Sequence, residues 1–397
     1  MKARSIGSGV HLLAAIDWDR RLFDALIPLP DGTSYNAYLV QGSEATALLD
    51  TVEPSLAEVL LEQLRDVPRL DYVVAHHAEQ DHSGTLPRVL AKYPEAKVLC
   101  SPKCKGMLVD HVGLDPERIR EVADGATLGL GGKTLEFVHT PWQHWPETIV
   151  TYLREEKILF SCDLFGSHLA TTELYPDDAL LYEPAKRYYA EIMMPFRTII
   201  QRNLDKLDRY ETRIIAPSHG PLFRRPEFIR SAYRDWVAGP VRNTVVLPYV
   251  TMHDSTKRMV DHLIAGLVER GVDVARFNMA TADLGKVAVA LVDAATIVLG
   301  TPTVLTGPHP AIAYLAFLVN SLRPKAKYVS VVGSFGWGGK TVEQLTAMLG
   351  NLKVEMLPAV LAKGLPKAED YAALDGLADA VAARHRELAE VAVGVAL

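Results

Sequence analysis

The first part of the chain alternates short apolar segments with turn-forming residues. Eight segments before residue 220 are rich in Val, Ile, Leu, Tyr and Thr and are bounded by Gly, Pro, Asp or Ser, which is typical of strands. Apolar residues at helical spacing predict a helix over 54–64 and a longer one over 188–207. Strands in meanders with helices between them favour two sheets sandwiched by helices. The strand segments are 34–40, 45–50, 70–76, 97–101, 134–140, 148–153, 157–163 and 213–219.

A different pattern begins after Val241. Apolar strands now alternate regularly with amphipathic helices in five units, which predicts a doubly wound parallel sheet with helices on both faces. The charged and aromatic stretch 223–240 ends in Gly-Pro and predicts a short helix followed by a linker. We therefore predict two domains, 1–240 and 241–397. The five strand segments are 244–250, 273–279, 295–302, 328–335 and 353–360.

Composition narrows the classes of function. The net charge of -6 is spread over mixed acidic and basic residues, which argues against a nucleic-acid binder with its concentrated basic face. No apolar run is long enough to cross a membrane, and the N-terminal apolar patch is too weak for a signal peptide. Cys100, Cys104 and Cys162 form neither a disulfide framework nor a zinc or iron–sulfur motif, so we interpret them as buried thiols in a cytoplasmic protein.

Ionisable residues gather directly after one predicted strand. The segment 70–86, LDYVVAHHAEQDHSGTL, places two His and two acidic residues within six positions, immediately before a helix. Side chains two apart in an extended segment share a face, so the first three can converge, and the fourth turns in at the helix start. These candidate metal ligands are His77, Glu79, Asp81 and His82.

Three further candidates lie at the ends of later strands: His144, Asp163 and His219. Each of them alone suits a cap or a surface group. Seven ionisable groups at the ends of four strands, however, indicate a site on one rim of the scaffold, because burying such groups is costly unless a cation compensates them. Of the other histidines, we assign His76 and His139 to structural contacts and His168 to support of the ligands.

The HxExDH motif is similar to that of the metallo-β-lactamase superfamily, whose hydrolases carry HxHxDH followed by a His, an Asp and a His. Here Glu79 replaces the second His. A carboxylate-rich site with four His suits iron in a redox role, whereas a His-rich site suits zinc in hydrolysis. Together with HWP at 144–146 and the second domain, the motif resembles the A-type flavodiiron protein family over essentially the whole chain. This resemblance implies an N-terminal metallo-β-lactamase-like αββα sandwich and a C-terminal flavodoxin-like domain.

The resemblance also implies roles for individual residues. One iron would be held by His77, Glu79 and His144, the other by Asp81, His82 and His219, with Asp163 as the bridge. An active-site tyrosine role falls to Tyr189, with the adjacent Tyr188 an equal candidate from sequence. Many relatives have Phe-His where this chain has Phe23-Asp24, a departure that bears on substrate preference.

Three loops of the second domain are expected to bind FMN. The loop after its first strand supplies hydroxyls at a helix N-terminus, an arrangement suited to a phosphate. The loop after the third strand shapes the ring pocket, and the glycines after the fourth allow close approach of the backbone to the ring. In this family the first loop usually has Gly where this chain has Asp254, whose carboxylate we expect to point outward. The predicted FMN-binding residues are Thr251, Met252, His253, Asp254, Ser255, Thr256, Pro302, Thr303, Val304, Leu305, Ser334, Phe335, Gly336, Trp337, Gly338 and Gly339.

The resemblance implies an oxidoreductase that reduces O2 to water, NO to N2O, or both, at the diiron site with electrons supplied through FMN. Two ferrous ions and one reduced flavin store the four electrons that O2 needs to become water. The sequence shows no CxxC rubredoxin segment, so we expect a separate electron donor such as rubredoxin or a flavin reductase. A head-to-tail homodimer is also implied. The alternatives are a zinc-dependent hydrolase of the same N-terminal fold and an O2 or NO sensor with the same cofactors.

Overall fold

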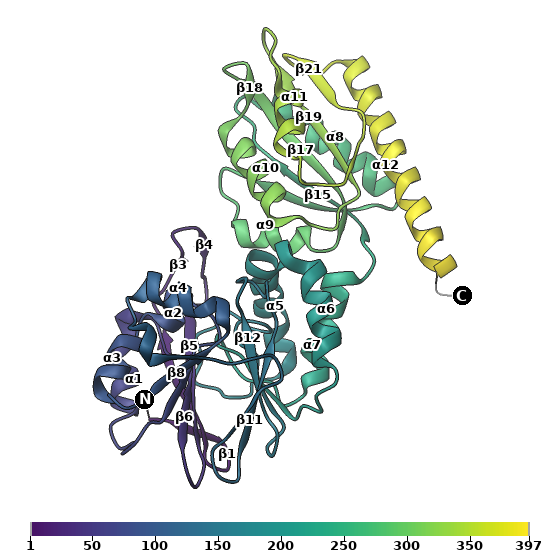
Figure 1. Ribbon diagram of the computed structural model, residues 1–397. Coiled ribbons are helices and arrows are strands. Elements are labelled where there is room, and N and C mark those ends of the chain that lie inside the picture. Colours follow the sequence, from purple (N-terminus) through teal and green to yellow (C-terminus); the bar gives the residue numbers. More distant parts are fainter. Residues whose placement is uncertain (1, 396–397) are drawn as a thin grey trace. The chain divides into compact units, whose positions relative to one another are not determined.

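The computed structural model describes residues 2–395. The chain divides into two compact units between Ala238 and Gly239. In the first unit two sheets are stacked (Figure 1). One has seven strands in the order β1-β2-β5-β6-β7-β8-β9, and the other has five in the order β10-β11-β12-β13-β14. The strands are β1 Arg4–Gly7, β2 Val10–Asp17, β5 Thr33–Gln41, β6 Thr46–Leu49, β7 Tyr72–Val74, β8 Lys97–Cys100, β9 Ile119–Glu121, β10 Thr127–Gly129, β11 Thr134–His139, β12 Ile149–Leu153, β13 Ile158–Phe160 and β14 Ile214–Ala216.

Apolar side chains from both sheets meet in one core. Leu12, Tyr38 and Val74 of the seven-stranded sheet belong to the same buried cluster as Phe137 and Phe160 of the five-stranded sheet. A second core joins the outer face of the seven-stranded sheet to helices α1 Ala57–Gln63, α3 Leu86–Lys92 and α4 Pro102–Val112. Helices α5 Asp178–Tyr188, α6 Arg197–Leu207 and α7 Pro226–Ala238 lie beside the five-stranded sheet (Figure 1). These layers confirm the predicted αββα sandwich.

Parallel pairing brings the ends of several strands to one rim. Strands β6, β7, β8 and β9 pair in parallel within one sheet, and β13 pairs in parallel with β14 in the other. The segments that leave β7, β13 and β14 therefore emerge at the carboxyl ends of buried strands, where the sequence places most candidate ligands. A small hairpin, β3 Leu22–Phe23 and β4 Ile27–Pro28, completes the strands of this unit.

Two details of the N-terminal unit differ from the prediction. The single helix predicted over 188–207 is wrong, because α5 ends at Tyr188 and is followed by a π-helical turn over Tyr189–Met193 and a 3₁₀ turn over Met194–Phe196 before α6 begins. Pro195 lacks the backbone N–H that a continuous helix needs. The prediction also missed strands β1, β2, β3, β4, β9 and β10. The apolar residues of β2 are buried on both of its faces and show little alternation, and the other missed strands are only two to four residues long.

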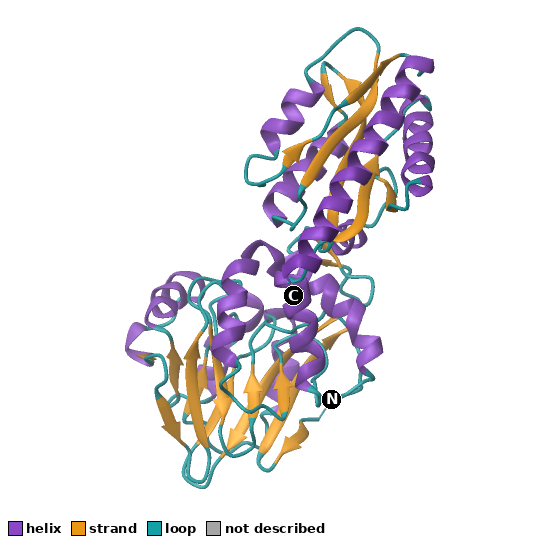
Figure 2. Cartoon of the chain, turned by 90° about the vertical axis from the view of Figure 1, so that its right-hand side faces the viewer, coloured by secondary structure: helices purple, strands orange, loops and turns teal. Residues whose placement is uncertain are grey.

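The second unit contains a five-stranded parallel path in the order β16-β15-β17-β19-β20, with β18 and β21 paired to it. Helices α8 and α12 share one core with the sheet, while the other core lies on the side of α9, α10 and α11. Figure 2 shows helices on both sides of this sheet, so the doubly wound flavodoxin-like architecture is confirmed. The elements are β15 Arg242–Tyr249, α8 Ser255–Glu269, β16 Asp273–Asn278, α9 Leu284–Leu291, β17 Ala294–Val304, β18 Gly307–Pro308, α10 Pro310–Leu322, β19 Tyr328–Phe335, α11 Thr341–Met348, β20 Glu355–Met356, β21 Val360–Lys363 and α12 Ala368–Val395.

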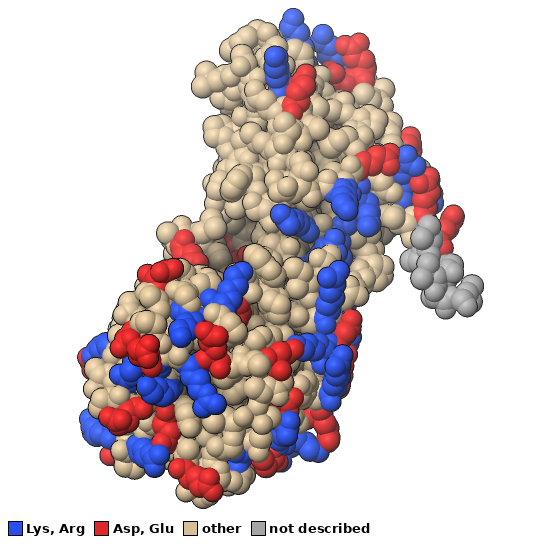
Figure 3. Space-filling view, viewed as in Figure 1, with Lys and Arg blue, Asp and Glu red and all other residues tan. Residues whose placement is uncertain are grey.

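The surface in Figure 3 carries basic and acidic side chains interspersed over the visible face of the N-terminal unit. This mixture agrees with the scattered charges of the sequence. Among the residues that the structure describes, no helix combines the length and the apolar character that crossing a bilayer requires.

Candidate metal centre

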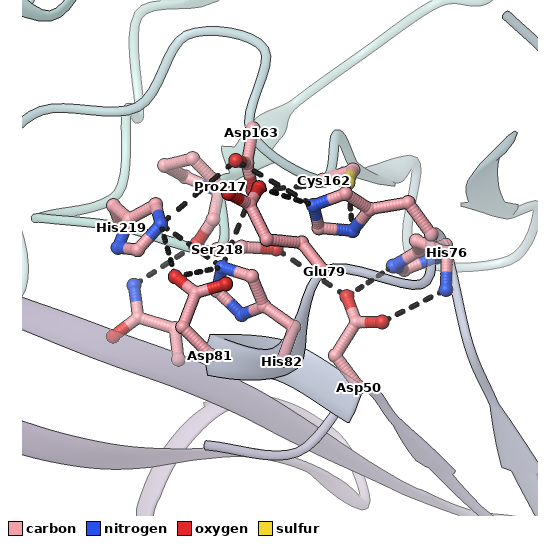
Figure 4. A network of polar contacts seen from close by, with 12 residues as sticks. Asp50, His76, Glu79, Asp81, His82, Cys162, Asp163, Pro217, Ser218 and His219 are labelled. Carbon is pink, nitrogen blue, oxygen red and sulfur yellow. Dashed lines mark hydrogen bonds and ion pairs between the residues drawn. The ribbon is translucent and has the colours of Figure 1, made fainter. Parts of the chain in front are cut away.

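The HxExDH segment leaves β7 and enters α2 (Gln80–Ser83) at the rim of the sheet. Alternation along the chain turns neighbouring histidines in opposite directions. His76 donates its backbone N–H to Asp50, and its ring contacts Asp50 and the hydroxyl of Thr151. His77 faces the other way, with its Nε2 atom 3.2 Å from Glu79 Oε2. His76 therefore supports the strand end, and His77 joins the group of candidate ligands, part of which is drawn in Figure 4.

All seven candidate ligands converge, and they fall into two groups. Within each group, the ligand atoms lie within 4.8 Å of one another. Asp163 connects the groups, since its Oδ2 lies 2.9 Å from His144 Nε2 and its Oδ1 lies 3.4 Å from His82 Nε2. The side chain of His82 is fully buried and points into the cluster (Figure 4). The first group is His77, Glu79, His144 and Asp163, and the second is Asp81, His82 and His219.

The second group has the donor chemistry of a cation site. His219 Nδ1 lies 2.9 Å from the backbone carbonyl of Ser34 and donates to it, so the neutral ring keeps its lone pair on Nε2. That Nε2 lies 2.9 Å from Nε2 of His82 and 3.3 Å from Asp81 Oδ2. Two imidazole nitrogens and a carboxylate that face one another in a buried site need a positive charge between them. A metal ion meets this need, so these residues fit the metal that the sequence predicts.

The electrostatic interactions in the cluster also favour a bound cation. Burial alone would lower the pKa of His82, but Asp81 and Asp163 outweigh it and raise that pKa to about 10. Burial is likewise outweighed at His144, where Glu79 and Asp163 raise the pKa to about 10. Although burial opposes it, the histidines hold the pKa of Asp163 well below its usual range. The carboxylates therefore remain ionised and attract protons or metal ions to the histidines.

After chelation of the metal, we expect the N-terminal unit to lose thermal stability as the pH rises from 6.5 toward 10. The raised pKa values of His82 and His144 stabilise the folded state fully below pH 6.5, the ordinary value, and this contribution is lost as the pH passes the folded value of about 10. Metal ions bind deprotonated ligands, so the loaded protein should not show this loss. Thermal unfolding of chelated and loaded protein across this pH range checks the prediction, and parallel profiles would contradict it.

The two adjacent tyrosines are placed differently from the prediction. Tyr188 OH donates to Asp163 Oδ2 at 2.9 Å, whereas Tyr189 OH donates to the backbone carbonyl of Trp236 at 3.1 Å. Tyr188 ends α5 and Tyr189 begins the π-helical turn, so their side chains diverge. The structure therefore brings Tyr188, and not Tyr189, to the candidate ligands.

Three more side chains contact the cluster or support a neighbour of it without having been predicted to do so. The ring of Tyr35 packs edge-on against His219 at 5.4 Å between centroids, and its buried hydroxyl has no hydrogen-bond partner among the described residues. Asp50 supports His76, as described above. Cys162 Sγ lies 3.3 Å from His77 Nδ1. The only sequence signals were the position of Asp50 at the end of a predicted strand and of Cys162 directly before Asp163.

The hairpin β3–β4 lies beside the same cluster. The ring of Phe23 lies 5.2 Å from that of His168 and 6.2 Å from that of His219. His168 itself is buried against Tyr188 and hydrogen-bonds the hydroxyl of Thr33 through Nδ1, in keeping with a supporting role. Asp24 follows Phe23 in the turn, and partial burial and the nearby acidic groups raise its pKa.

In the second unit the three predicted loops follow β15, β17 and β19, which are neighbours in the sheet. Thr256 Oγ1 lies 3.1 Å from Ser334 Oγ, and Thr303 Oγ1 lies 2.8 Å from Thr341 Oγ1. These contacts link the loops to one another at the carboxyl ends of the strands. Asp254 has a positive φ of 63° and an exposed side chain that makes no capping bond. This conformation explains why Gly suits the position and leaves the carboxylate directed outward.

The rims of these loops carry exposed side chains. Trp337 is 87% exposed, Leu305 is 92% exposed and Met252 is 54% exposed. The close approach of two loops also explains one glycine, because a Cβ at Gly339 would lie 2.7 Å from Thr303 Cγ2. Most of the remaining predicted FMN-binding residues lie at the same end of the sheet. They belong to the ends of β17 and β19 and to the segments that follow these strands.

Known proteins resemble this chain over its whole length. The model of a family described as ODP family beta lactamase matches residues 33–220. A nitric oxide reductase of Moorella thermoacetica is 35% identical and aligns over 96% of this chain and 98% of its own. The rubredoxin:oxygen oxidoreductase of Desulfovibrio gigas superposes with a TM-score of 0.94 at 30% identity, covering 98% of this chain and 99% of that one. A flavodiiron protein from Giardia intestinalis superposes with a TM-score of 0.91 at 26% identity, covering 98% of both chains.

Fold and site together define an oxidoreductase with a metallo-β-lactamase-like domain and a flavodoxin-like domain. The chain belongs to the flavodiiron protein family. The predicted family and fold class are thereby confirmed, and FMN and two non-haem iron ions are the cofactors of this family.

Proposed function

We propose that this chain reduces O2 to water, NO to N2O, or both, at a diiron centre in its N-terminal unit, with electrons supplied through FMN in its C-terminal unit. The observation that carries the proposal is the convergence of two ligand groups with Asp163 between them. When bound, two adjacent irons and a flavin supply up to four electrons, which covers the four that O2 needs to become water and the two that two NO need to become N2O. The Moorella relative is named a nitric oxide reductase and the Desulfovibrio protein an oxygen oxidoreductase, so both substrates stay open.

The two ligand groups indicate which residues would hold each iron. His77, Glu79 and His144 would hold one ion, and Asp81, His82 and His219 would hold the other, with Asp163 reaching both. His144 and Glu79 are the least buried ligands, with side chains 12% and 14% exposed. This ligand group is therefore the more open to solvent, and substrate is expected to enter on that side.

Two tyrosines beside the cluster have distinct tasks in this proposal. Tyr188 holds a hydroxyl proton at Asp163, and burial together with Asp163 raises its pKa well above 10, which keeps that proton in place at neutral pH. Tyr35 covers His219 and His82 from behind and excludes water from that side. Its pKa is also raised by burial.

The FMN phosphate would lie at the N-terminus of α8, where Thr251, Ser255 and Thr256 offer hydroxyls and the helix offers free N–H groups. Trp337 and Leu305 would border the ring. Electrons would come from a separate donor, either rubredoxin, which the name of the Desulfovibrio protein includes, or a flavin reductase. The three free, buried cysteines suit the reducing cytoplasm that we propose as the location.

A head-to-tail homodimer would place each FMN beside the partner's irons. Each unit exposes large apolar side chains, Trp18 and Leu22 in the first and Trp337 and Leu305 in the second. Such groups are commonly covered in an oligomer. Sedimentation velocity distinguishes this dimer from a monomer.

We expect the protein loaded with iron and FMN to consume O2, NO or both far above background when a chemically reduced donor is supplied under anaerobic mixing. Oxygen and nitric oxide electrodes, used side by side with one donor, measure the two rates and reveal the preference. Background rates for both gases at full iron and FMN content would reject catalysis and favour a sensor. Two zinc ions per chain without a yellow flavin would instead favour a hydrolase.

A further inference from the structure

Cys162 contacts two candidate ligands from a fully buried position. Its Sγ lies 3.3 Å from His77 Nδ1 and 3.8 Å from Asp163 Oδ1, and the residue has no exposed surface. Figure 4 shows Cys162 next to Asp163 in the network of polar contacts. The thiol therefore lies on the Nδ1 side of the His77 ring, whereas the other candidate ligands lie on its Nε2 side.

The tautomer of His77 decides which partner donates in this contact. Nε2 of His77 faces the cluster, 3.2 Å from Glu79 Oε2 and 3.8 Å from Asp163 Oδ2. A metal ion on Nε2 needs the lone pair there, so the ring proton must reside on Nδ1. The sulfur of Cys162 is the atom that Nδ1 faces, and it accepts this N–H. Its own S–H is then free to donate to Asp163 Oδ1.

The backbone holds the thiol in this place. Cys162 has a φ of 54°, in the left-handed region that non-glycine residues seldom adopt. Its carbonyl accepts the backbone N–H of Ser218 at 2.8 Å, which ties the turn after β13 to the segment that carries His219. The turn therefore orients Cys162 and Asp163 together.

The ligand histidines differ in what supports their Nδ1 atoms. His219 donates to a backbone carbonyl, a strong acceptor, whereas Nδ1 of His82 is buried without a hydrogen-bond partner among the described residues. His77 alone of these three has a sulfur, which is a weak acceptor. We propose that Cys162 is a positioning residue whose thiol accepts the Nδ1–H of His77 and holds that ring, in the tautomer that binds metal, toward the first iron.

This inference rests on the proposed diiron centre, and Co²⁺ tests it without turnover. Paramagnetic Co²⁺ shifts the exchangeable ring protons of bound histidines, and ¹⁵N-labelled histidine identifies them. In wild-type protein with two Co²⁺, we expect shifted Nδ1–H resonances for His77 and His219. In Cys162→Ala, the His77 resonance should broaden or vanish through faster solvent exchange while that of His219 remains. One of the two Co²⁺ affinities, that of the ligand group containing His77, should fall by about 10–100-fold, as for other groups that hold a metal ligand.

Two further variants separate positioning from packing. Cys162→Ser keeps an acceptor, so the His77 resonance should persist at a shifted position and the affinity should stay within about tenfold of wild type. Cys104→Ser alters another buried thiol of the same unit, on α4, and should leave both resonances and both affinities unchanged. If Cys162→Ala does not fold, Cys162→Ser carries the test.

An unchanged His77 resonance and unchanged Co²⁺ affinity in Cys162→Ala would overturn the role of Cys162. A His77 resonance at the wild-type position in Cys162→Ser would also overturn the role of Cys162. Failure of the wild-type protein to bind two Co²⁺ ions would overturn the diiron proposal itself, and the role of Cys162 with it.

Discussion

Replacing Asp163 with Ala should remove both metal ions and reduce O2 and NO consumption to background, while FMN stays bound. Among the described residues, Asp163 is the one carboxylate that contacts histidines of both ligand groups, with Oδ2 at 2.9 Å from His144 and Oδ1 at 3.4 Å from His82. Its loss removes one of the carboxylates that balance the buried histidines, and removal of one partner from a buried ion pair costs about 3–5 kcal/mol. His77→Ala should act in the same direction, because it deletes a ligand of the first group.

Metal analysis, flavin absorbance and gas electrodes on the same preparation measure the three parts of this result. Asp110→Asn, which removes an exposed carboxylate on α4, is the matched control and should keep metals, FMN and rates. FMN should remain because its predicted loops belong to the other compact unit. Loss of FMN in Asp163→Ala would show that the two units depend on each other, and retention of both metals would contradict the bridging position.

The seven candidate ligands could be predicted because they follow a general rule of strand ends. Buried strands leave little room for ionisable groups, so a run such as His77 to His82 directly after β7 stands out from its surroundings. Glu79, in place of the second His of the hydrolase motif, then favoured an iron site over a zinc site. Alternation along an extended segment was enough to separate His76 from His77, and the structure turns their rings to different partners.

Other parts of the site depend on contacts that a sequence does not display. The turn at Cys162 adopts a left-handed conformation that its sequence does not require, and only this turn aims the sulfur at His77. Tyr35 reaches His219 because two strands distant in sequence, β5 and β14, deliver them to one rim. Tyr188 and Tyr189 were indistinguishable because a regular helix was assumed where the chain forms a π-helical turn.

Tyr188→Phe should reduce the rates of O2 and NO consumption by about 100-fold while both metals stay bound, whereas Tyr189→Phe should leave the rates nearly unchanged. The hydroxyl of Tyr188 is 2.9 Å from Asp163 Oδ2, and a positioned proton donor is worth about 100-fold or more. The hydroxyl of Tyr189 bonds the carbonyl of Trp236 instead, so its loss should cost about 1 kcal/mol of stability.

Each of the two tyrosine variants is the control for the other, because each deletes one buried hydroxyl and the two residues are adjacent in the chain. Rates, metal content and thermal unfolding of both variants decide between them. A loss of metal in Tyr188→Phe would mean that the hydroxyl holds Asp163 in position rather than acting in turnover. A drop in rate confined to Tyr189→Phe would reverse the assignment, because the hydrogen bond to Trp236 would then matter more to the reaction than the one to Asp163.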